Sequence, residues 1–240
     1  MSSVTVLIPA AGAGLRLGAA RPKAFVDICG RSMLSWAVAG VVDSGVVDRV
    51  VVMVPPDLTD ETAALVPDSV LVIAGGAERI DSVRAGLATL TSGDENDIVL
   101  VHDAARCLTP AAVFERVVAA AADPYWAGAI PGLPVADTIK SVNAAGGVTG
   151  TPQRAGLRAI QTPQGFRLGV LRQAYAQTGL DGVATDDAGL VESLGGAVRV
   201  VPGDPLAFKI TTQWDLRTAE RLLNPDATAA PMTDKIEREH

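Results

Sequence analysis

The first half of the chain alternates short runs of Val and Ile with amphipathic segments of helix length. This alternation is typical of β-α units, which place parallel strands in one sheet and helices on its faces. We therefore expect an α/β fold with a Rossmann-like, mainly parallel sheet flanked by helices. The predicted strands are Val4 to Pro9, Arg49 to Val54, Val70 to Ala74, Ile98 to His102, Gly128 to Pro131 and, late in the chain, Ala197 to Val201.

Helix-length segments lie between and after these strands. Thr109 is expected to cap the helix that begins at Pro110, because proline suits the first turn of a helix. The predicted helices are Ser32 to Asp43, Thr59 to Val66, Arg79 to Leu90, Pro110 to Ala122, Leu168 to Gln177, Asp187 to Leu194 and Gln213 to Leu223.

The pattern changes over residues 134–158, where Gly146-Gly147, Gly150 and Pro152 interrupt alternating polar residues. Such a stretch favours an extended hairpin, so we expect a β-arm that protrudes from the sheet and mediates dimerisation. Residues 1–223 are predicted to form one domain that includes this arm. The polar tail 224–240 is predicted to be disordered, because it offers no apolar face to bury.

Composition excludes several classes of protein. The net charge of −7 argues against a nucleic-acid surface, which needs an excess of Lys and Arg. No apolar run approaches the roughly 18 residues that span a bilayer, so no membrane partner is expected. Two cysteines are too few for a disulfide framework, and both are expected to be free thiols. Met1-Ser2-Ser3 leads straight into a strand-like run with no basic region or cleavable apolar segment, so we expect a cytoplasmic protein.

A glycine-rich loop follows the first strand, and Arg21-Pro22-Lys23 comes after it. Glycines let backbone N–H groups approach phosphate oxygens closely, Arg16 can bind phosphate in a bidentate manner, and Lys23 adds a point charge. This combination predicts a nucleoside triphosphate site. The loop reads Ala10-Ala11-Gly12-Ala13-Gly14-Leu15-Arg16-Leu17-Gly18.

Two other nucleotide motifs do not fit this loop. A dinucleotide fingerprint requires a third glycine where the chain has Leu17, and an acid after the second strand where it has Pro55-Pro56. A P-loop requires Ser or Thr after its lysine, whereas Lys23 is followed by Ala24.

With its Ala-Ala-Gly-x-Gly-x-Arg and downstream Pro-Lys, the loop resembles that of the sugar-phosphate nucleotidyltransferases. Further motifs, in the same order, resemble the 2-C-methyl-D-erythritol 4-phosphate cytidylyltransferase family over residues 4 to about 222. Cys107 and Ala77 depart from the family pattern, which usually has proline and an acid there. The motifs are Gly75-Gly76-Ala77-Glu78-Arg79-Ile80-Asp81-Ser82-Val83, Val101-His102-Asp103-Ala104-Ala105-Arg106, Asp137-Thr138 with Lys140, Thr162-Pro163-Gln164, Ala184-Thr185-Asp186-Asp187 and Phe208-Lys209-Ile210-Thr211.

The resemblance implies a homodimeric, magnesium-dependent enzyme of the non-mevalonate isoprenoid route. Its implied reaction joins CMP from CTP to a small polyol phosphate, which gives 4-diphosphocytidyl-2-C-methyl-D-erythritol and pyrophosphate. Its implied catalytic residues are Arg16, Lys23, Arg154 and Lys209. The implied nucleotide-binding residues are Pro9, Ala10, Ala11, Gly12, Ala13, Gly14, Arg16, Lys23, Gly75, Gly76, Ser82 and Ala104. The implied acceptor-binding residues are Asp103, Arg106, Thr138, Arg154, Thr162 and Lys209.

Single residues leave some roles open. Asp103, at the end of a strand, could hold acceptor hydroxyls or a hydrated magnesium ion, or cap a helix. His102 is favoured as an orienting or core residue, because an ionised phosphate nucleophile needs no general base. Arg79 and Asp81 are expected to cap and solvate a helix, and Cys107 lacks a base partner for thiol catalysis.

Three alternative functions remain at this point. Ribitol-5-phosphate cytidylyltransferases share the loop and the arm. A nucleotide-sugar glycosyltransferase would normally carry an Asp-x-Asp metal motif, which the chain lacks. A non-catalytic nucleotide-binding protein would have no need for acceptor cations such as Arg154 and Lys209.

Overall fold

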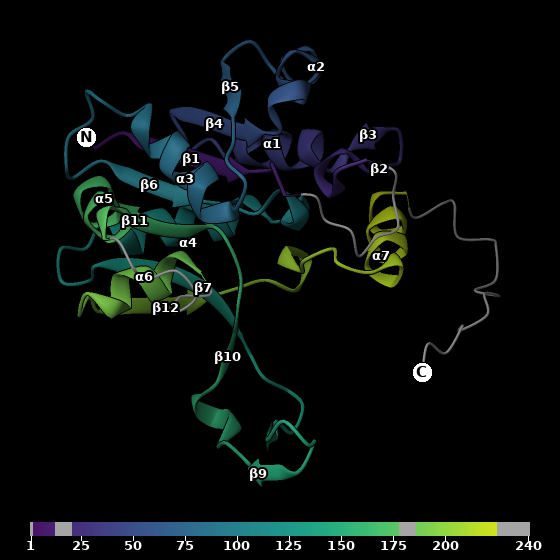
Figure 1. The fold of residues 1–240 in the computed structure, drawn as a ribbon, viewed down its shortest axis with the longest axis vertical. Coiled ribbons are helices and arrows are strands. Elements are labelled where there is room, and N and C mark those ends of the chain that lie inside the picture. Colours follow the sequence, from purple (N-terminus) through teal and green to yellow (C-terminus); the bar gives the residue numbers. More distant parts are fainter. Residues whose placement is uncertain (1, 13–20, 178–185, 225–240) are drawn as a thin grey trace.

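The computed structural model describes residues 2–12, 21–177 and 186–224. Its centre is an eight-stranded sheet with strand order β10-β7-β11-β6-β1-β4-β5, and β12 pairs with β7 (Figure 1). The predicted strands are all present, some with slightly different ends. The strands are β1 (Val4–Pro9), β4 (Arg49–Val54), β5 (Val70–Ala74), β6 (Ile98–Val101), β7 (Gly128–Pro134), β10 (Arg158–Ile160), β11 (Gln164–Arg167) and β12 (Val198–Pro202).

Helices cover both faces of the sheet and enclose two apolar cores. Val6 and Ile8 of β1 face the core that α1 and α4 cover, whereas Leu7 between them faces the core that α3 and α5 cover. This alternation is the two-residue period of a strand that is buried on both faces, and it accounts for the continuous apolar runs. The helices are α1 (Met33–Asp43), α2 (Thr59–Leu65), α3 (Arg79–Ala88), α4 (Ala111–Ala121), α5 (Leu168–Ala176), α6 (Asp187–Ser193) and α7 (Gln213–Leu223).

Strand β1 lies at the point where the order of successive strands in the sheet reverses. β4 pairs with β1 in parallel on one side and β5 continues on that side, whereas β6 pairs in parallel on the other side. Loops that leave the carboxyl ends of β1 and β6 therefore diverge. A crevice at such a switch point is where open α/β sheets bind ligands.

Strand β11 and the cap of α4 differ from the prediction. Strand β11 was not predicted, because among its residues only Phe166 is a large apolar one; it nevertheless inserts antiparallel between β6 and β7. Its Gly165 is required by close packing, since a Cβ there would lie 2.7 Å from Val117 and 2.8 Å from Leu100. The predicted cap of α4 was wrong. Pro110 is the N-cap, and the Thr109 hydroxyl instead donates to the Arg106 carbonyl at 2.7 Å.

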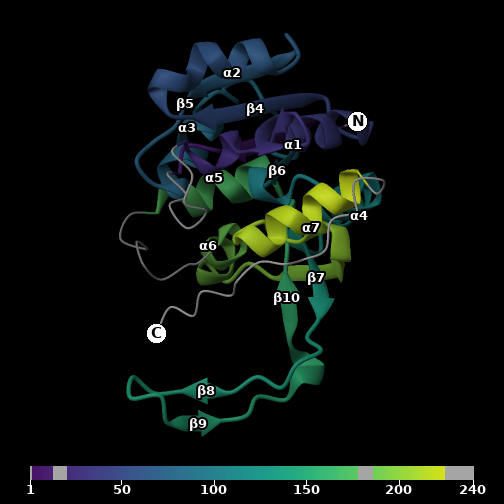
Figure 2. The same ribbon diagram turned by 90° about the vertical axis from the view of Figure 1, so that its right-hand side faces the viewer.

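A β-arm protrudes from the edge of the sheet over the predicted stretch (Figure 2). β7 leads into it, β10 returns antiparallel, and the tip carries the hairpin of β8 (Ser141–Val142) and β9 (Val148–Gly150). Val142 and Val148 are 60% and 63% exposed. The role of the arm in dimerisation and the domain boundaries stay predictions, and residues 225–240 lie outside the described part of the chain. None of the described helices is long and apolar enough to cross a membrane.

Candidate functional site

Loops from the carboxyl ends of β1 and β6 meet the start of α3 and the segment before α7 at one edge of the sheet. They enclose a cavity of about 340 Å³. Most of its lining residues were predicted from sequence as nucleotide- or acceptor-binding. The lining residues are Pro9, Ala10, Ala11, Gly12, Lys23, Ala24, Met33, Arg79, Ser82, Asp103, Ala104, Ala105 and Lys209.

The phosphate loop begins directly after β1. The backbone N–H of Ala10 donates to the Met53 carbonyl at 2.7 Å, so the loop leaves the sheet from a fixed position. The predicted site residues Ala13, Gly14 and Arg16 lie outside the described residues. Their placement in the triphosphate site therefore stays a prediction.

Lys23 lines the cavity and is the first residue of a short 3-10 helix, η2 (Lys23–Phe25). Ala24 and Phe25 are buried, and the Phe25 N–H donates to the Pro22 carbonyl at 2.9 Å. The apolar residues after Lys23 thus anchor its backbone while the side chain lines the cavity. A fixed cation beside a phosphate loop is suited to bind a triphosphate.

The Gly75-Gly76 turn packs behind the phosphate loop. A Cβ on Gly75 would lie 2.7 Å from the Ala11 Cβ and 2.8 Å from the Ser82 Oγ, so only glycine fits. The buried Ser82 hydroxyl accepts from the Gly76 N–H at 3.1 Å and donates to the Glu78 carbonyl at 3.1 Å. Ser82 therefore fixes the turn as well as lining the cavity.

Substituting Gly76 with alanine should displace this turn. The added Cβ would lie 2.2 Å from the Asp81 Cβ and 3.2 Å from the Asp81 backbone. We expect overpacking to cost about 1–3 kcal/mol of unfolding free energy and to weaken CTP binding. Thermal unfolding and calorimetry with CTP measure both effects. Gly150→Ala is the matched control, because within the described part of the chain only its sequence neighbours come within 4 Å of its added Cβ. Equal behaviour of the two variants would contradict the role of the turn.

Asp103 lies at the end of β6, where three cations surround its carboxylate. Its Oδ2 is 2.9 Å from the Lys209 Nζ and 3.8 Å from the Arg106 Nε, and its Oδ1 is 3.5 Å from the Arg79 Nε. Burial alone would raise the pKa of Asp103, but the three cations and the hydrogen bond from Lys209 outweigh it and lower the pKa to about 2. Asp103 is therefore ionised at neutral pH and holds Lys209 at the cavity.

Lys209 is fixed by the residues on either side of it. Phe208 packs against a buried apolar cluster and Ile210 is 1% exposed. The Ile210 N–H also donates to the Ala105 carbonyl at 2.9 Å. The backbone on one side of Lys209 is thus tied to the loop that carries Asp103, and its ammonium group faces the cavity.

Arg106 and Thr162 support the site from behind. The Arg106 guanidinium donates to the carbonyls of Ala207 at 2.7 Å and Ile160 at 3.2 Å. The buried Thr162 hydroxyl accepts from the Asp103 N–H at 3.0 Å. Neither residue lines the cavity. Their side chains hold the Asp103 loop in place, and their predicted contact with the acceptor stays a prediction.

Arg79 was expected to be a solvated helix-capping residue, and this expectation was wrong. Its Nη1 and Nη2 bind the two oxygens of Asp187 at 3.1 and 2.6 Å, and its side chain lines the cavity. Asp81 does cap α3, paired with Glu78. The only feature of the sequence that pointed to a partner for Arg79 was the second acid of Asp186-Asp187. The structure buries the Asp187 side chain completely.

His102 is a core residue. It is 1% exposed, its ring packs against Phe114 with centroids 5.0 Å apart, and its Nδ1 lies 3.1 Å from the Thr162 Oγ1. Burial lowers the pKa of His102 to about 4, so the ring is neutral at physiological pH. This supports an orienting role over acid-base chemistry.

His102 should make stability depend on pH. The unfolded chain takes up a proton below about pH 6.5, but the folded chain does so only near its pKa of about 4. The unfolding free energy should therefore fall by about 3 kcal/mol as pH drops from 6.5 to 4. Chemical denaturation across this range tests it. His102→Asn should flatten the slope, and an unchanged slope would contradict a buried neutral imidazole.

Cys107 is also buried, and burial raises the pKa of its thiol to about 12. A neutral thiol is a poor nucleophile at physiological pH. The geometry thus agrees with the expectation that Cys107 takes no part in thiol catalysis.

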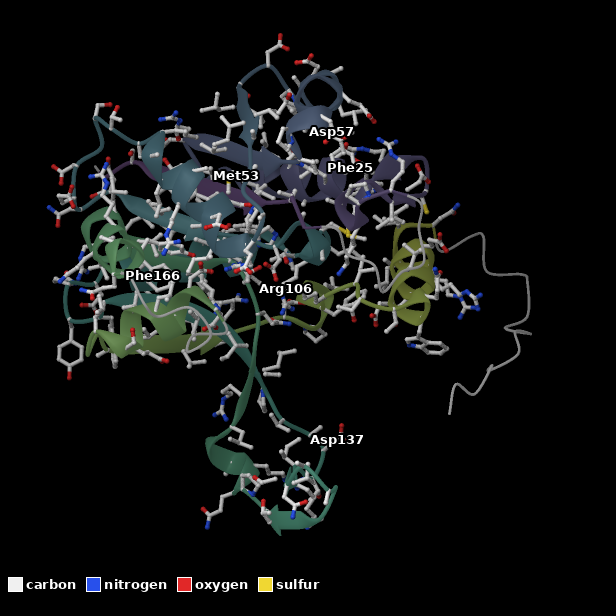
Figure 3. All side chains as sticks on the ribbon, viewed as in Figure 1. Phe25, Met53, Asp57, Arg106, Asp137 and Phe166 are labelled. Carbon is white, nitrogen blue, oxygen red and sulfur yellow. The ribbon has the colours of Figure 1, made fainter. Side chains whose placement is uncertain are left out.

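The arm residues lie apart from the cavity. Thr138 and Arg154 are exposed, and the Arg154 guanidinium donates to the Ala136 carbonyl at 2.7 Å. Figure 3 shows Asp137 on the arm, well separated from Arg106 at the sheet. One chain therefore does not bring Thr138 or Arg154 to the residues that line its own cavity.

The predicted magnesium ligand Asp103 does not fit direct coordination. Both of its oxygens already face cations, which repel a dication. Among the described residues, no three His, Cys, Asp or Glu side chains are grouped to hold a metal ion.

A family comparison agrees with this geometry. The sequence model of the 2-C-methyl-D-erythritol 4-phosphate cytidylyltransferases matches residues 4–225. The chain belongs to this family. A member from Rhodococcus jostii (strain RHA1) is 57% identical over 227 residues, which cover 93% of this chain and 96% of the relative. A member from Nocardia farcinica (strain IFM 10152) is 57% identical over 224 residues, which cover 92% and 94%.

Solved structures of the family share the fold. The cytidylyltransferase from Thermus thermophilus is 38% identical with a TM-score of 0.73, covering 92% of this chain and 98% of that one. The Francisella tularensis enzyme is 28% identical with a TM-score of 0.80, covering 91% and 98%. These findings confirm the predicted α/β fold and the predicted class, a cytidylyltransferase.

Proposed function

We propose that this chain transfers CMP from CTP to 2-C-methyl-D-erythritol 4-phosphate, which yields 4-diphosphocytidyl-2-C-methyl-D-erythritol and pyrophosphate. Relatives that share 57% of its residues carry the name of this activity. The observation that carries the proposal is one cavity lined both by Lys23, beside the phosphate loop, and by the Asp103–Lys209 pair. Two anionic substrates need two such sets of charges.

In this reaction a phosphate oxygen of the acceptor attacks the α-phosphorus of CTP. A new P–O bond forms in line with the breaking bond to the β-phosphate, and pyrophosphate leaves with that electron pair. No covalent enzyme intermediate is needed. The protein accelerates such a step by holding the two anions together and by stabilising the charge of the transition state.

The residues divide this work between them. Pro9 to Gly14, Gly75, Gly76, Ser82 and Ala104 form the nucleotide side, where backbone N–H groups and the cations Arg16 and Lys23 bind the triphosphate. Lys209 binds the acceptor phosphate. Asp103 holds Lys209 and accepts hydrogen bonds from hydroxyl groups of the acceptor. Arg106 and Thr162 fix the Asp103 loop.

The arm supports a homodimer. Val142 and Val148 expose apolar surface on a projecting hairpin, which a second copy of the chain could cover. Thr138 and Arg154 lie on the same arm and outside the cavity of their own chain, so we assign their acceptor contacts to the cavity of the partner copy. A dimer measured by light scattering, lost when the tip 141–150 is removed, would support this arrangement.

Magnesium fits this site as a companion of the triphosphate. Mg²⁺ keeps several waters and commonly binds through substrate phosphates. It would neutralise charge on the phosphates when bound. Because cations surround Asp103, its carboxylate would contact the magnesium ion only through a water molecule. Because both substrates are small, multiply charged molecules, we further propose that the enzyme acts in the cytoplasm.

The test is pyrophosphate release with CTP and magnesium, using 2-C-methyl-D-erythritol 4-phosphate, ribitol 5-phosphate or no acceptor. We expect release with the methylerythritol phosphate alone. Release with ribitol phosphate instead would keep the chemistry and change the acceptor. Binding of CTP without release for any acceptor would favour a non-catalytic nucleotide-binding protein.

A further inference from the structure

A chain of ionic contacts runs from the helices behind the cavity to Lys209. The Tyr175 hydroxyl on α5 donates to Asp187 Oδ1 on α6, and Asp187 holds the Arg79 guanidinium through both oxygens. Arg79 contacts Oδ1 of Asp103, and Oδ2 of Asp103 holds Lys209 at 2.9 Å. Below, these five residues are called the ionic chain.

The buried end of the ionic chain is its fixed point. Asp187 has no exposed surface, and its Oδ1 accepts from both Arg79 and Tyr175. Burial disfavours the charged form of Arg79, but the adjacent Asp187 outweighs this and raises the pKa of the guanidinium. Asp187 and Arg79 thus form a bidentate pair, the geometry in which arginine and carboxylate bind most strongly.

The bidentate pair determines which nitrogen of Arg79 meets Asp103. With Nη1 and Nη2 bound to Asp187, the closest contact between Arg79 and Asp103 joins Nε to Oδ1 at 3.5 Å. This leaves Oδ2 for Lys209. Without the pair, the guanidinium could turn and bind both oxygens of Asp103, which would displace Lys209 from Oδ2.

We infer that Asp187 is a positioning residue for the transfer reaction, which acts through Arg79 and Asp103 to hold Lys209 where the acceptor phosphate binds. The inference rests on the proposed function, because it assigns Lys209 to the acceptor. It gives a role to the second acid of the Asp186-Asp187 pair; Asp186 instead caps α6 by accepting from the Gly189 N–H at 2.9 Å.

The test is a double-mutant cycle between Asp187→Asn and Lys209→Ala. Asn keeps the size of Asp187 and one acceptor oxygen but removes the charge. In the wild-type background, Asp187→Asn should lower kcat/KM for the acceptor by about 10- to 100-fold and change the KM for CTP little. In the Lys209→Ala background, the same substitution should cost less than about twofold, because its target is gone.

Glu192→Gln is the matched control, since it removes an exposed carboxylate from the same helix. Should Asp187→Asn fail to fold, Arg79→Lys replaces it in the cycle, because lysine keeps the charge but cannot form the bidentate pair. Melting temperatures of all variants separate loss of fold from loss of position.

A purely structural role would give losses that multiply in the double variant, and that outcome would overturn the inference while leaving the proposed function intact. A wild-type protein that releases no pyrophosphate with CTP and methylerythritol phosphate would overturn both. If Asp187→Asn lowers kcat/KM only in the background that retains Lys209, the positioning role is established.

Discussion

Lys23→Ala should lower turnover by about 100- to 1000-fold, comparable with the loss of one oxyanion donor. The Lys23 side chain lines the cavity beside the phosphate loop, and the buried residues Ala24 and Phe25 fix its backbone. A cation about 4 Å from a phosphate gains roughly 4 kcal/mol at an effective dielectric near 20, before desolvation. Removing it weakens stabilisation of the triphosphate as charge moves to the leaving pyrophosphate.

Steady-state pyrophosphate release gives kcat and the KM for each substrate. The loss should fall on kcat and on the KM for CTP, with the KM for the acceptor changed little. Arg199→Ala is the control, since it removes an exposed cation from β12, outside the cavity. If Lys23→Ala retained more than about a tenth of wild-type turnover, Lys23 would not be the triphosphate cation.

Lys209→Ala should cause a loss of similar size on the other substrate. Its Nζ lies 2.9 Å from Asp103 Oδ2, and its backbone is tied through Ile210 to the same loop as Asp103. Removing the ammonium group leaves the acceptor phosphate without its cation next to a carboxylate that repels it. We expect kcat/KM for the acceptor to fall about 100- to 1000-fold.

The KM for CTP separates this variant from Lys23→Ala, because it should stay close to the wild-type value. Lys209→Arg should recover part of the activity, since it keeps the charge at a similar reach. A rise in the KM for CTP with no change for the acceptor would reverse the assignment of the two lysines.

The sequence predicted the sheet well because its central strands β1, β4 and β6 are buried on both faces. Continuous runs such as Arg49–Val54 then stand out from the amphipathic segments between them. Strand β11 was not predicted because Gly165 leaves it little apolar side-chain volume, although it lies in the middle of the sheet. Its place depends on the close approach of α4 and β6, which no local pattern in the sequence reports.

The cavity was predicted because its residues lie in motifs, and motifs at strand ends meet at one edge of the sheet. The burial of individual side chains and the pairing of charged residues could not be predicted in the same way. Arg79 looked like a solvated helix residue because its partner Asp187 is 108 positions away in the chain. No motif reported that the Arg106 guanidinium donates to the Ala207 and Ile160 carbonyls, or that the Thr162 hydroxyl accepts from the Asp103 N–H.

The most direct test follows oxygen atoms from the acceptor. 2-C-methyl-D-erythritol 4-phosphate labelled with ¹⁸O in its phosphate is incubated with CTP, magnesium and the enzyme, and both products are analysed by mass spectrometry. Attack on the α-phosphorus predicts that all label, including the bridging oxygen, stays in 4-diphosphocytidyl-2-C-methyl-D-erythritol and that pyrophosphate is unlabelled. Label in pyrophosphate, or no labelled nucleotide product, would contradict the proposed transfer.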